Sequence, residues 1–282
     1  MTVPPAAPAA RSLERDDAPR VAADAPIDSL PVVELFHSIQ GEGIRVGEPA
    51  TFIRLAGCNL RCSWCDTPYS WNREGLRSAR RTPIDELAAS ARERAVVITG
   101  GEPMLHHRKL GALIDELRAH GTDRHVTVET NATIAAPDLM GAVDLWSLSP
   151  KLPGSGEPFP TDSVGEILDL AHASTASRER TSERAGVQLK FVIVDLAADW
   201  AAMWQHLDEL GIGLPTSPGS RRDVPVLVQP DGYRDDYDAA IRELVELVAA
   251  DDTLRAGVPR RSLVRVVPQI HRVAWGPAAR GV

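Results

Sequence analysis

The sequence has few cysteines, no long hydrophobic run and too little positive charge for several classes of protein. Its three cysteines cannot all pair, so disulfide bonds explain them poorly. Hydrophobic residues make up 43% of the chain, yet no apolar run reaches the roughly 18 to 20 residues that span a bilayer. A net charge of −8 argues against a large nucleic-acid surface, because phosphate binding needs clustered Lys and Arg. We therefore expect no membrane or nucleic-acid partner, and a small-molecule substrate.

The N-terminal segment differs in composition from the rest of the chain. Residues 1–31 lack a continuous apolar stretch and carry several acidic groups, which argues against secretory and transit peptides and favours a cytoplasmic protein. We predict that this segment is a disordered tail. Residues 32–282 are then long enough to bury a sizeable core as a single domain.

Segments rich in Val, Ile and Leu alternate with helical patterns along residues 32–282. This order favours βα units around a mainly parallel sheet, and therefore an α/β fold. The predicted strands are Val32–Phe36, Thr51–Leu55, Ala95–Thr99, His125–Glu129, Leu145–Leu148, Gln188–Val194, Val224–Val228 and Leu263–Val267.

Two predicted helices have recognisable ends. One begins with Thr82 as its N-cap and Pro83 as its first residue. The other covers Arg108–His120 and ends at Gly121, a residue that can adopt the left-handed conformation common after helices. Apolar residues at helical spacing predict two more helices with core-facing stripes, Trp200–Leu210 and Tyr237–Val248.

Polar motifs follow the predicted strands directly. The carboxyl ends of parallel strands lie at one edge of a sheet, where barrels and open α/β sheets collect their active sites. We therefore expect these motifs to line one pocket. They are CNLRCSWC (58–65), TGGEP (99–103), ETN (129–131), SPK (149–151) and QPDG (229–232).

All three cysteines fall in the segment 58–65, as Cys58, Cys62 and Cys65. Disulfides would close only very small loops here. A structural zinc site usually has four ligands, and the nearest histidines, His37 and His106, are far away in sequence. Three thiolates on a cluster of four irons would leave one iron free to bind a small molecule. We favour the iron–sulfur cluster and keep zinc as the alternative.

The spacing C-x3-C-x2-C, with Trp64 before the last cysteine, resembles the signature of the radical S-adenosylmethionine (SAM) superfamily. The resemblance implies a 4Fe-4S cluster on the three cysteines, with SAM bound to the open iron and cleaved to a 5′-deoxyadenosyl radical. Residues 99–103 resemble the GGEP segment of the superfamily, which meets the SAM amino group. It implies that SAM contacts include Trp64, Gly100, Gly101 and Glu102.

Two further segments narrow the resemblance. Residues 39–43 read IQGEG and residues 52–58 read FIRLAGC, which is similar to the 7-carboxy-7-deazaguanine synthase family from about Glu34 to Gly276. The resemblance implies that Arg54 pairs with a substrate carboxylate and that Gln40 and Glu42 bind a pterin edge. A solvated turn is the alternative for Gln40 and Glu42, and a surface charge at a sheet edge is the alternative for Arg54. The remaining substrate contacts implied are Ile39, Gly41, Thr99 and His271.

The same resemblance assigns a magnesium ligand and more SAM contacts. Thr67, two residues after the last cysteine, matches a hydroxyl that binds Mg²⁺ in the family, although it could also be a turn residue before Pro68. The SAM contacts implied are Glu129, Asn131, Ser149, Lys151 and Gln229. Each could instead be an ordinary turn, capping or loop residue, and the same holds for His271. Lys190 is left without a role.

The family implies a partial (β/α) barrel that converts 6-carboxy-5,6,7,8-tetrahydropterin to 7-carboxy-7-deazaguanine with loss of ammonia. It also implies a homodimer and an electron donor such as a flavodoxin or ferredoxin. Two features depart from it: the chain continues past Gly276, and Pro153–Gly186 is longer than a minimal barrel needs, which we interpret as a surface insertion. The alternatives are a glycyl-radical-enzyme activase, which shares the triplet and GGEP, and a non-catalytic metal-binding module.

Overall fold

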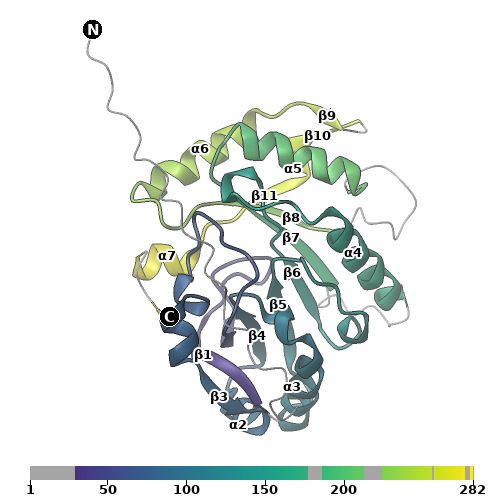
Figure 1. Ribbon diagram of the computed structural model, residues 1–282. Coiled ribbons are helices and arrows are strands. Elements are labelled where there is room, and N and C mark those ends of the chain that lie inside the picture. Colours follow the sequence, from purple (N-terminus) through teal and green to yellow (C-terminus); the bar gives the residue numbers. More distant parts are fainter. Residues whose placement is uncertain (1–28, 177–185, 213–223, 256, 277–279, 282) are drawn as a thin grey trace.

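The computed structural model describes residues 29–176, 186–212, 224–255, 257–276 and 280–281 (Figure 1). The first strand begins at Ser29, so residues 29–31 of the expected tail belong to the sheet, and residues 1–28 lie outside the described part. None of the helices within these ranges has the length and apolar character needed to cross a membrane.

Nine strands form one sheet in the order β11-β8-β7-β6-β5-β4-β2-β1-β3. Neighbours from β11 to β2 are parallel, whereas β1 runs antiparallel to both β2 and β3. The sheet is therefore an open, partial barrel with β11 and β3 at its edges. Its strands are β1 (Ser29–Ile39), β2 (Pro49–Leu55), β3 (Arg80–Pro83), β4 (Ala95–Gly100), β5 (His125–Thr130), β6 (Leu145–Leu148), β7 (Gly186–Ile193), β8 (Val226–Pro230) and β11 (Val264–Val266).

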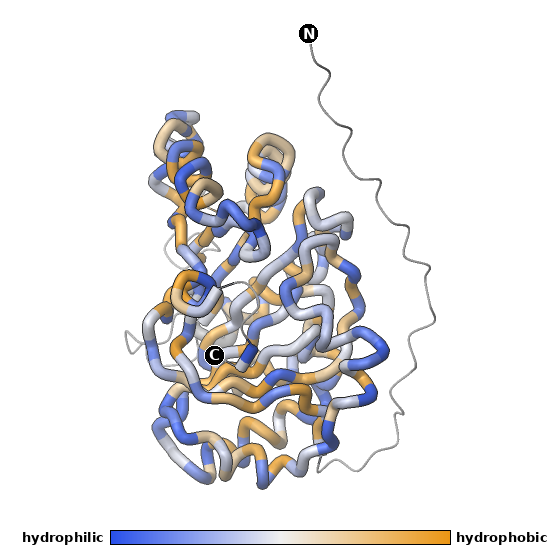
Figure 2. The backbone as a smooth tube through the Cα atoms, turned by 90° about the vertical axis from the view of Figure 1, so that its left-hand side faces the viewer, coloured by the Kyte–Doolittle hydropathy of each residue, from blue (hydrophilic) through white to orange (hydrophobic). Residues whose placement is uncertain are grey.

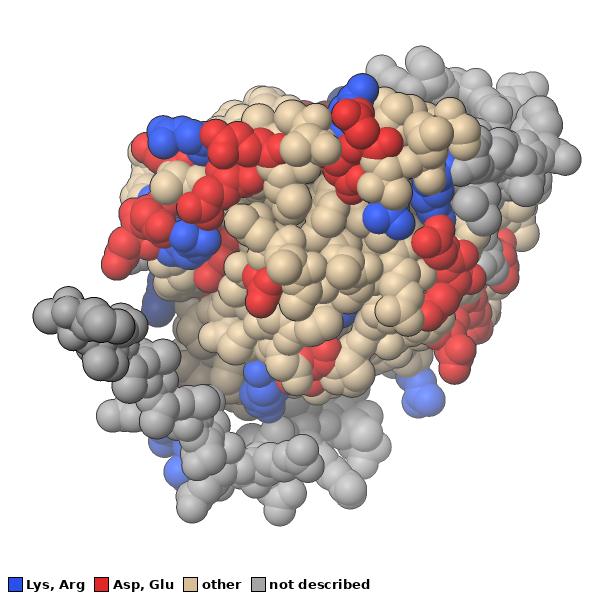
Figure 3. Space-filling model, turned by 90° about the horizontal axis from the view of Figure 1, so that it is seen from above, with Lys and Arg blue, Asp and Glu red and all other residues tan. Residues whose placement is uncertain are grey.

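Helices lie around the outside of this curved sheet (Figure 1). The main ones are α2 (Ile84–Ser90), α3 (His107–His120), α4 (Thr161–Ala176), α5 (Ala198–Glu209) and α6 (Tyr237–Ala250). Shorter elements are α1 (Arg73–Ser78), α7 (Ile270–Trp275) and the β9–β10 hairpin (Leu254–Arg255 and Val258–Pro259). Acidic and basic side chains are interspersed on the face that α5 and α6 form (Figure 3).

Alternation along the strands decides which side chains face the helices and which face the hollow. On β4, Val96 and Ile98 pack into the main core against the helices, while Val97 joins a small cluster on the opposite face. The apolar segments of the hydropathy-coloured chain follow these strands and the helices outside them (Figure 2). Every second residue of a strand is therefore available to the concave face, and there it is often polar.

All eight strands predicted from the sequence are present, with shifts of a few residues at their ends. The two apolar stripes are also confirmed. Buried side chains recur on α5 at Trp200, Met203, Trp204 and Leu207, and on α6 at Tyr237, Ala240, Leu244 and Val248. The segment Pro215–Asp223 is rich in Pro, Gly and Ser, a composition typical of a surface loop, and it lies outside the described residues.

Three local predictions are wrong. Thr82 pairs in β3 with β1 instead of capping a helix, so Pro83 becomes the N-cap and α2 begins at Ile84. Gly121 ends α3 with an extended φ of −171°, because the chain turns directly toward β5 and needs no left-handed residue. Residues 153–176 are not a surface insertion, because α4 forms part of the crossover between β6 and β7 and buries Val164, Ile167 and Leu168 in the core. Residues 177–185 of the expected insertion lie outside the described part of the chain.

Candidate active site

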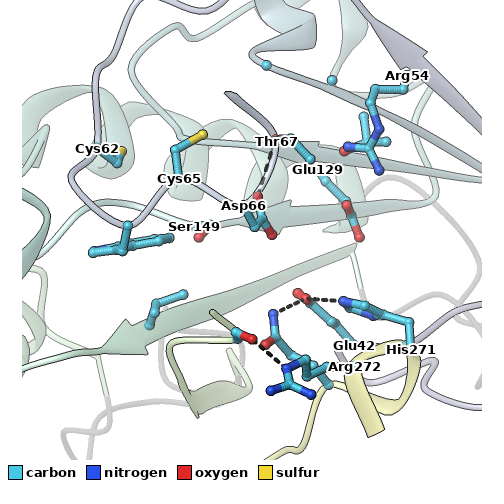
Figure 4. Close-up of a pocket in the computed structure, with 18 of the residues that line it drawn as sticks. Glu42, Arg54, Cys62, Cys65, Asp66, Thr67, Glu129, Ser149, His271 and Arg272 are labelled. Carbon is cyan, nitrogen blue, oxygen red and sulfur yellow. Dashed lines mark hydrogen bonds and ion pairs between the residues drawn. The ribbon is translucent and has the colours of Figure 1, made fainter. Parts of the chain in front are cut away.

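A large pocket opens on the concave face at the carboxyl ends of the parallel strands. Cys62 and Cys65 lie toward one end of it, and Arg54, Glu42 and His271 lie toward the other (Figure 4). The predicted site residues that line it are Ile39, Gln40, Gly41, Glu42, Arg54, Cys58, Cys62, Trp64, Cys65, Thr67, Thr99, Gly100, Gly101, Glu129, Asn131, Ser149, Lys151, Gln229 and His271. Each of the five polar motifs that follow the strands contributes residues to this pocket, which confirms the expectation that they share one pocket.

The cysteine loop follows β2 and is held against the end of β4. Gly57 adopts a left-handed φ of 96°, which turns the chain out of the strand. The Gly101 N–H donates to the Leu55 carbonyl at 3.1 Å, and the Glu102 N–H donates to the Gly57 carbonyl at 2.7 Å. A Cβ on Gly101 would lie 2.3 Å from the Gly57 oxygen and 2.8 Å from the Cys58 Cβ. Glycine is therefore required where the GGEP segment meets the cysteines.

Glu102 does not line the pocket, contrary to its predicted role as a SAM contact. Its side chain is fully buried, and its carboxylate accepts hydrogen bonds from the Thr130 hydroxyl, the Asn131 N–H and the Met104 N–H at 2.7 to 2.8 Å. These bonds join the loops after β4 and β5. Glu102 thus shapes the wall of the pocket from behind, whereas Thr99, Gly100 and Gly101 of the same segment line the pocket.

The three thiols fit a multi-iron cluster. Cys58, Cys62 and Cys65 are free, partly exposed and gathered at the same end of the pocket. Burial raises the pKa of the Cys58 thiol to about 11, so this group ionises readily only when bound cations stabilise the thiolate. Across the described ranges, no group of three His, Cys, Asp or Glu side chains is arranged to hold a single metal ion. Three thiols that line one pocket are a ligand set that suits a 4Fe-4S cluster.

Polar side chains beside the cysteines come from β5 and from the loop after β6. Lys151 Nζ lies 4.9 Å from the centroid of the Trp64 ring and 3.3 Å from the Ser149 hydroxyl. Asn131 Nδ2 donates to Asn59 Oδ1 at 2.9 Å, which ties the β5 loop to the cysteine loop. Gln229 Oε1, at the end of β8, is buried without a partner among the described residues. It is a free acceptor for a bound molecule.

The QGEG turn is buried, so the alternative of a solvated turn is wrong. Gln40 Nε2 donates to Glu129 Oε1 at 3.1 Å, and Gln40 Oε1 accepts from the Glu42 N–H at 3.0 Å. The turn also supports α7, since the Ile270 N–H donates to the Gly41 carbonyl at 3.0 Å. A Cβ on Gly41 would lie 2.3 Å from His271 Nδ1, so glycine is needed for this contact.

Glu42 is the centre of a buried ionic network. Its carboxylate pairs with the Lys190 ammonium, accepts from Gln269 Nε2 at 2.7 Å and lies 3.9 Å from His271 Nε2. Burial alone would raise the pKa of Glu42, but the nearby charges of Lys190 and His271 lower it to about 2. The same pair raises the pKa of Lys190. Both groups are therefore ionised at neutral pH.

Arg54 lies inside the sheet, and the alternative of a surface charge at an edge is wrong. Strand β2 has β1 on one side and β4 on the other, and alternation turns Arg54 toward the pocket while Ile53 and Leu55 enter the core. Arg54 Nε donates to Glu34 Oε2 at 3.0 Å, and the Tyr69 hydroxyl donates to the same oxygen at 3.1 Å. Because only Nε is engaged in this contact, the guanidinium can still offer N–H groups to an anion in the pocket.

Thr67 projects into the middle of the pocket beside Asp66 (Figure 4). Its hydroxyl donates to Asp66 Oδ1 at 3.2 Å, and the Tyr233 hydroxyl donates to the Asp66 carbonyl at 3.0 Å. A hydroxyl and a carboxylate oxygen are ligands of the kind that Mg²⁺ accepts. Thr67 also ends the loop as the residue before a 3-10 turn, Pro68–Ser70, so its position is fixed by local structure.

Sequence reasoning missed several residues of the pocket. Alternation on β7 could have identified Lys190, because Leu189 and Phe191 are apolar neighbours that face the core. No comparable signal marks Gln269 or Trp71, which lie in irregular segments between short elements. The C-terminal residues Arg280 and Gly281 also line the pocket, so the chain beyond Gly276 returns to the site.

Chemically, the arrangement can hold an iron–sulfur cluster at one end and a flat, polar molecule with a carboxylate at the other. Phe36 and Phe52 stack with ring centroids 4.8 Å apart and form an apolar part of the pocket wall beside Arg54. A carboxylate facing Arg54 would be paired, and polar edges facing Gln40 and Glu42 would find donors and acceptors.

Comparison with known proteins agrees with this geometry. Residues 52–146 match the Radical SAM superfamily. The chain is 33% identical over 257 residues to a 7-carboxy-7-deazaguanine synthase of Halobacterium salinarum, covering 89% of this chain and 92% of the relative. It is 42% identical over 253 residues to one of Pyrobaculum aerophilum, covering 88% and 95%.

A solved structure also resembles this chain over most of its length. The crystal structure of QueE from Escherichia coli is similar with a TM-score of 0.58 and 25% sequence identity, covering 86% of this chain and 95% of that chain. The agreement extends over nearly the whole domain and includes the segment with the three cysteines. The chain is a radical SAM enzyme and belongs to the 7-carboxy-7-deazaguanine synthase family.

Proposed function

We propose that this enzyme converts 6-carboxy-5,6,7,8-tetrahydropterin to 7-carboxy-7-deazaguanine with loss of ammonia. One observation carries the proposal: the cysteine triplet and the polar wall of Arg54, Gln40 and Glu42 line the same pocket. The agreement with synthases over about nine-tenths of the chain disfavours both a glycyl-radical-enzyme activase and a non-catalytic metal module.

When bound, the 4Fe-4S cluster and SAM supply the radical that removes a hydrogen atom from the substrate. Cys58, Cys62 and Cys65 would hold the cluster with one side open to the pocket. The residues of the pocket wall that would bind and orient SAM are Trp64, Gly100, Gly101, Glu129, Asn131, Ser149, Lys151 and Gln229. Two observations support these assignments. Lys151 lies over the Trp64 ring, and Gln229 Oε1 is a buried acceptor without a partner among the described residues.

The far end of the pocket would bind the pterin. Arg54 would pair with the 6-carboxylate, while Gln40, Glu42 and His271 would face the polar edges of the ring. Ile39, Gly41 and Thr99 complete this part of the wall. Because Lys190 keeps Glu42 ionised, the carboxylate acts only as an acceptor and favours a substrate edge that donates hydrogen bonds.

The proposal includes a magnesium ion bound in this pocket. Thr67 would bind it, with the neighbouring Asp66 carboxylate as a further oxygen ligand or a partner of its waters. Thr67 would thus hold a cation that, together with Arg54, balances the negative charge of the substrate carboxylate. We also propose that the enzyme is a cytoplasmic homodimer reduced by a flavodoxin or ferredoxin.

The most direct test is an anaerobic assay of reconstituted protein with the carboxytetrahydropterin, SAM and a chemical reductant. We expect 7-carboxy-7-deazaguanine by mass spectrometry. Arg54→Met should weaken substrate binding by about 2 to 5 kcal/mol, because a buried charge pair loses one partner. The KM for the pterin should therefore rise strongly, whereas the rate of SAM cleavage without the pterin should change little. If no deazaguanine forms although iron and SAM are bound, the proposal is wrong.

Thr67→Val provides a test of the magnesium site, since valine keeps the shape of threonine without its hydroxyl. We expect added Mg²⁺ to raise turnover in the wild type and this response to weaken in the variant. The iron content should be unchanged, because Thr67 is not a cluster ligand. Equal magnesium titrations of the two proteins would remove Thr67 from the metal site.

A further inference from the structure

Trp71 contacts the last cysteine of the triplet directly. Its indole Nε1–H donates to Cys65 Sγ at 3.2 Å, within the range of an N–H···S hydrogen bond. Trp71 directly follows the 3-10 turn Pro68–Ser70, where its own N–H donates to the Pro68 carbonyl. The backbone therefore holds the ring beside a sulfur that stands for a thiolate ligand when the cluster is bound.

A face of the same indole ring carries the Arg61 cation, whereas the ring edge contacts Cys65. The Arg61 guanidinium carbon lies 4.4 Å from the centroid of the Trp71 ring. Arg61 Nη1 also donates to the carbonyls of Cys58 and Leu60 at 3.0 and 2.7 Å, which fixes the guanidinium over the loop that carries the cysteines. Arg61, Trp71 and Cys65 thus form a continuous contact from an exposed arginine to a cluster ligand.

We propose that Trp71 raises the reduction potential of the cluster by hydrogen bonding to the Cys65 ligand, and that Arg61 strengthens this effect. The proposal rests on the iron–sulfur cluster of the radical SAM enzyme and is independent of the pterin chemistry. It assigns Trp71 as a positioning and tuning residue, because it acts through Cys65 and not on the substrate.

The physical reason is electrostatic. Adding an electron increases the negative charge on the cluster and on its thiolates, so a donor aimed at a ligand sulfur stabilises the reduced form more than the oxidised form. A guanidinium stacked on the indole acts in the same direction. Its positive charge lies near the cluster, and it polarises the ring so that the N–H becomes a better donor. An electron donor with a less negative reduction potential could then reduce the cluster and start turnover.

The test is an anaerobic redox titration of the substrate-free, reconstituted enzyme, followed by electron paramagnetic resonance (EPR). Trp71→Phe keeps an aromatic face for Arg61 but removes the N–H. We expect the ratio of reduced to oxidised cluster at a fixed potential to fall about threefold to tenfold, which for a one-electron couple is about 30 to 60 mV. Trp200→Phe is the matched control. Trp200 lies on α5 outside the pocket, and the substitution removes its indole N–H hydrogen bond to Asp251. Its potential should equal that of the wild type.

An unchanged potential in Trp71→Phe with an intact cluster would overturn the proposal. If this variant does not retain its cluster, the wild type can be measured alone. Pulsed EPR of reduced protein with ¹⁵N-labelled tryptophan should then detect a nitrogen coupled to the cluster through the N–H···S bond. Absence of this coupling would also overturn the proposal. Neither measurement uses the pterin, so both remain valid if the substrate assignment fails.

Discussion

Cys62→Ala is expected to abolish turnover and to lower the iron content of the reconstituted protein. All three cysteines of the chain lie in one loop, and no fourth cysteine can replace a lost ligand. With two thiolates the cluster would have two open irons and would be lost readily, so we expect activity below detection instead of a partial decrease. Iron analysis and the anaerobic assay measure both effects.

Ser63→Ala is the matched control for this experiment. Ser63 lies between the ligands, but its hydroxyl donates to the Gly154 carbonyl at 2.9 Å and does not line the pocket. This variant should keep about four irons per chain and most of its activity. A Cys62→Ala protein that retains turnover, or a wild type that binds one zinc and no iron, would contradict the cluster assignment.

Lys190→Met is expected to destabilise the fold by about 3 to 5 kcal/mol, because it leaves the Glu42 carboxylate buried without its main counter-charge. The Lys190 and Glu42 side chains are only 10% and 11% exposed, so water can compensate little. Urea unfolding of the anaerobic, reconstituted proteins, followed by circular dichroism, measures the loss. The double variant Glu42→Gln with Lys190→Met removes both charges and should recover most of the stability.

The pH dependence of Lys190→Met has a defined sign. In the wild type the pKa of Glu42 is lowered to about 2, so the ion pair contributes fully above the ordinary value of 4.5 and is lost as pH falls toward 2. Without Lys190, the burial of Glu42 dominates and its pKa should rise above 4.5. The variant should then be least impaired below pH 4.5 and become less stable as pH increases. A deficit that does not depend on pH would show that Glu42 gains a different partner.

Much of the site could be predicted from the sequence because its motifs are contiguous and follow apolar strands. The cysteine triplet can be recognised from its spacing alone. The alternation of a strand places Arg54 on the opposite face of β2 from Ile53 and Leu55, which enter the core. The same alternation allows Lys190 on β7 to face the pocket, but a long lysine side chain can also extend to solvent, so the sequence leaves its role open. Element ends were less predictable, since the pairing of Thr82 with β1 outweighed its tendency to cap a helix.

Contacts between distant segments could not be read from the sequence. Glu102 is 28 residues from Thr130, and the fold alone turns its carboxylate behind the wall instead of toward a ligand. Gln269 is 227 residues from Glu42, with which it bonds. The crossover α4 was mistaken for an insertion because its role depends on where β6 and β7 lie in the sheet.

We expect this pocket to couple radical generation at the cysteines to rearrangement of a pterin without net redox change. Substrate deuterated at C6 tests it most directly, because a hydrogen removed from C6 and returned after rearrangement allows SAM to be used repeatedly. We predict that deuterium appears in recovered SAM and that product exceeds the SAM supplied by many turnovers. Stoichiometric consumption of SAM, with deuterium found only in 5′-deoxyadenosine, would contradict the account.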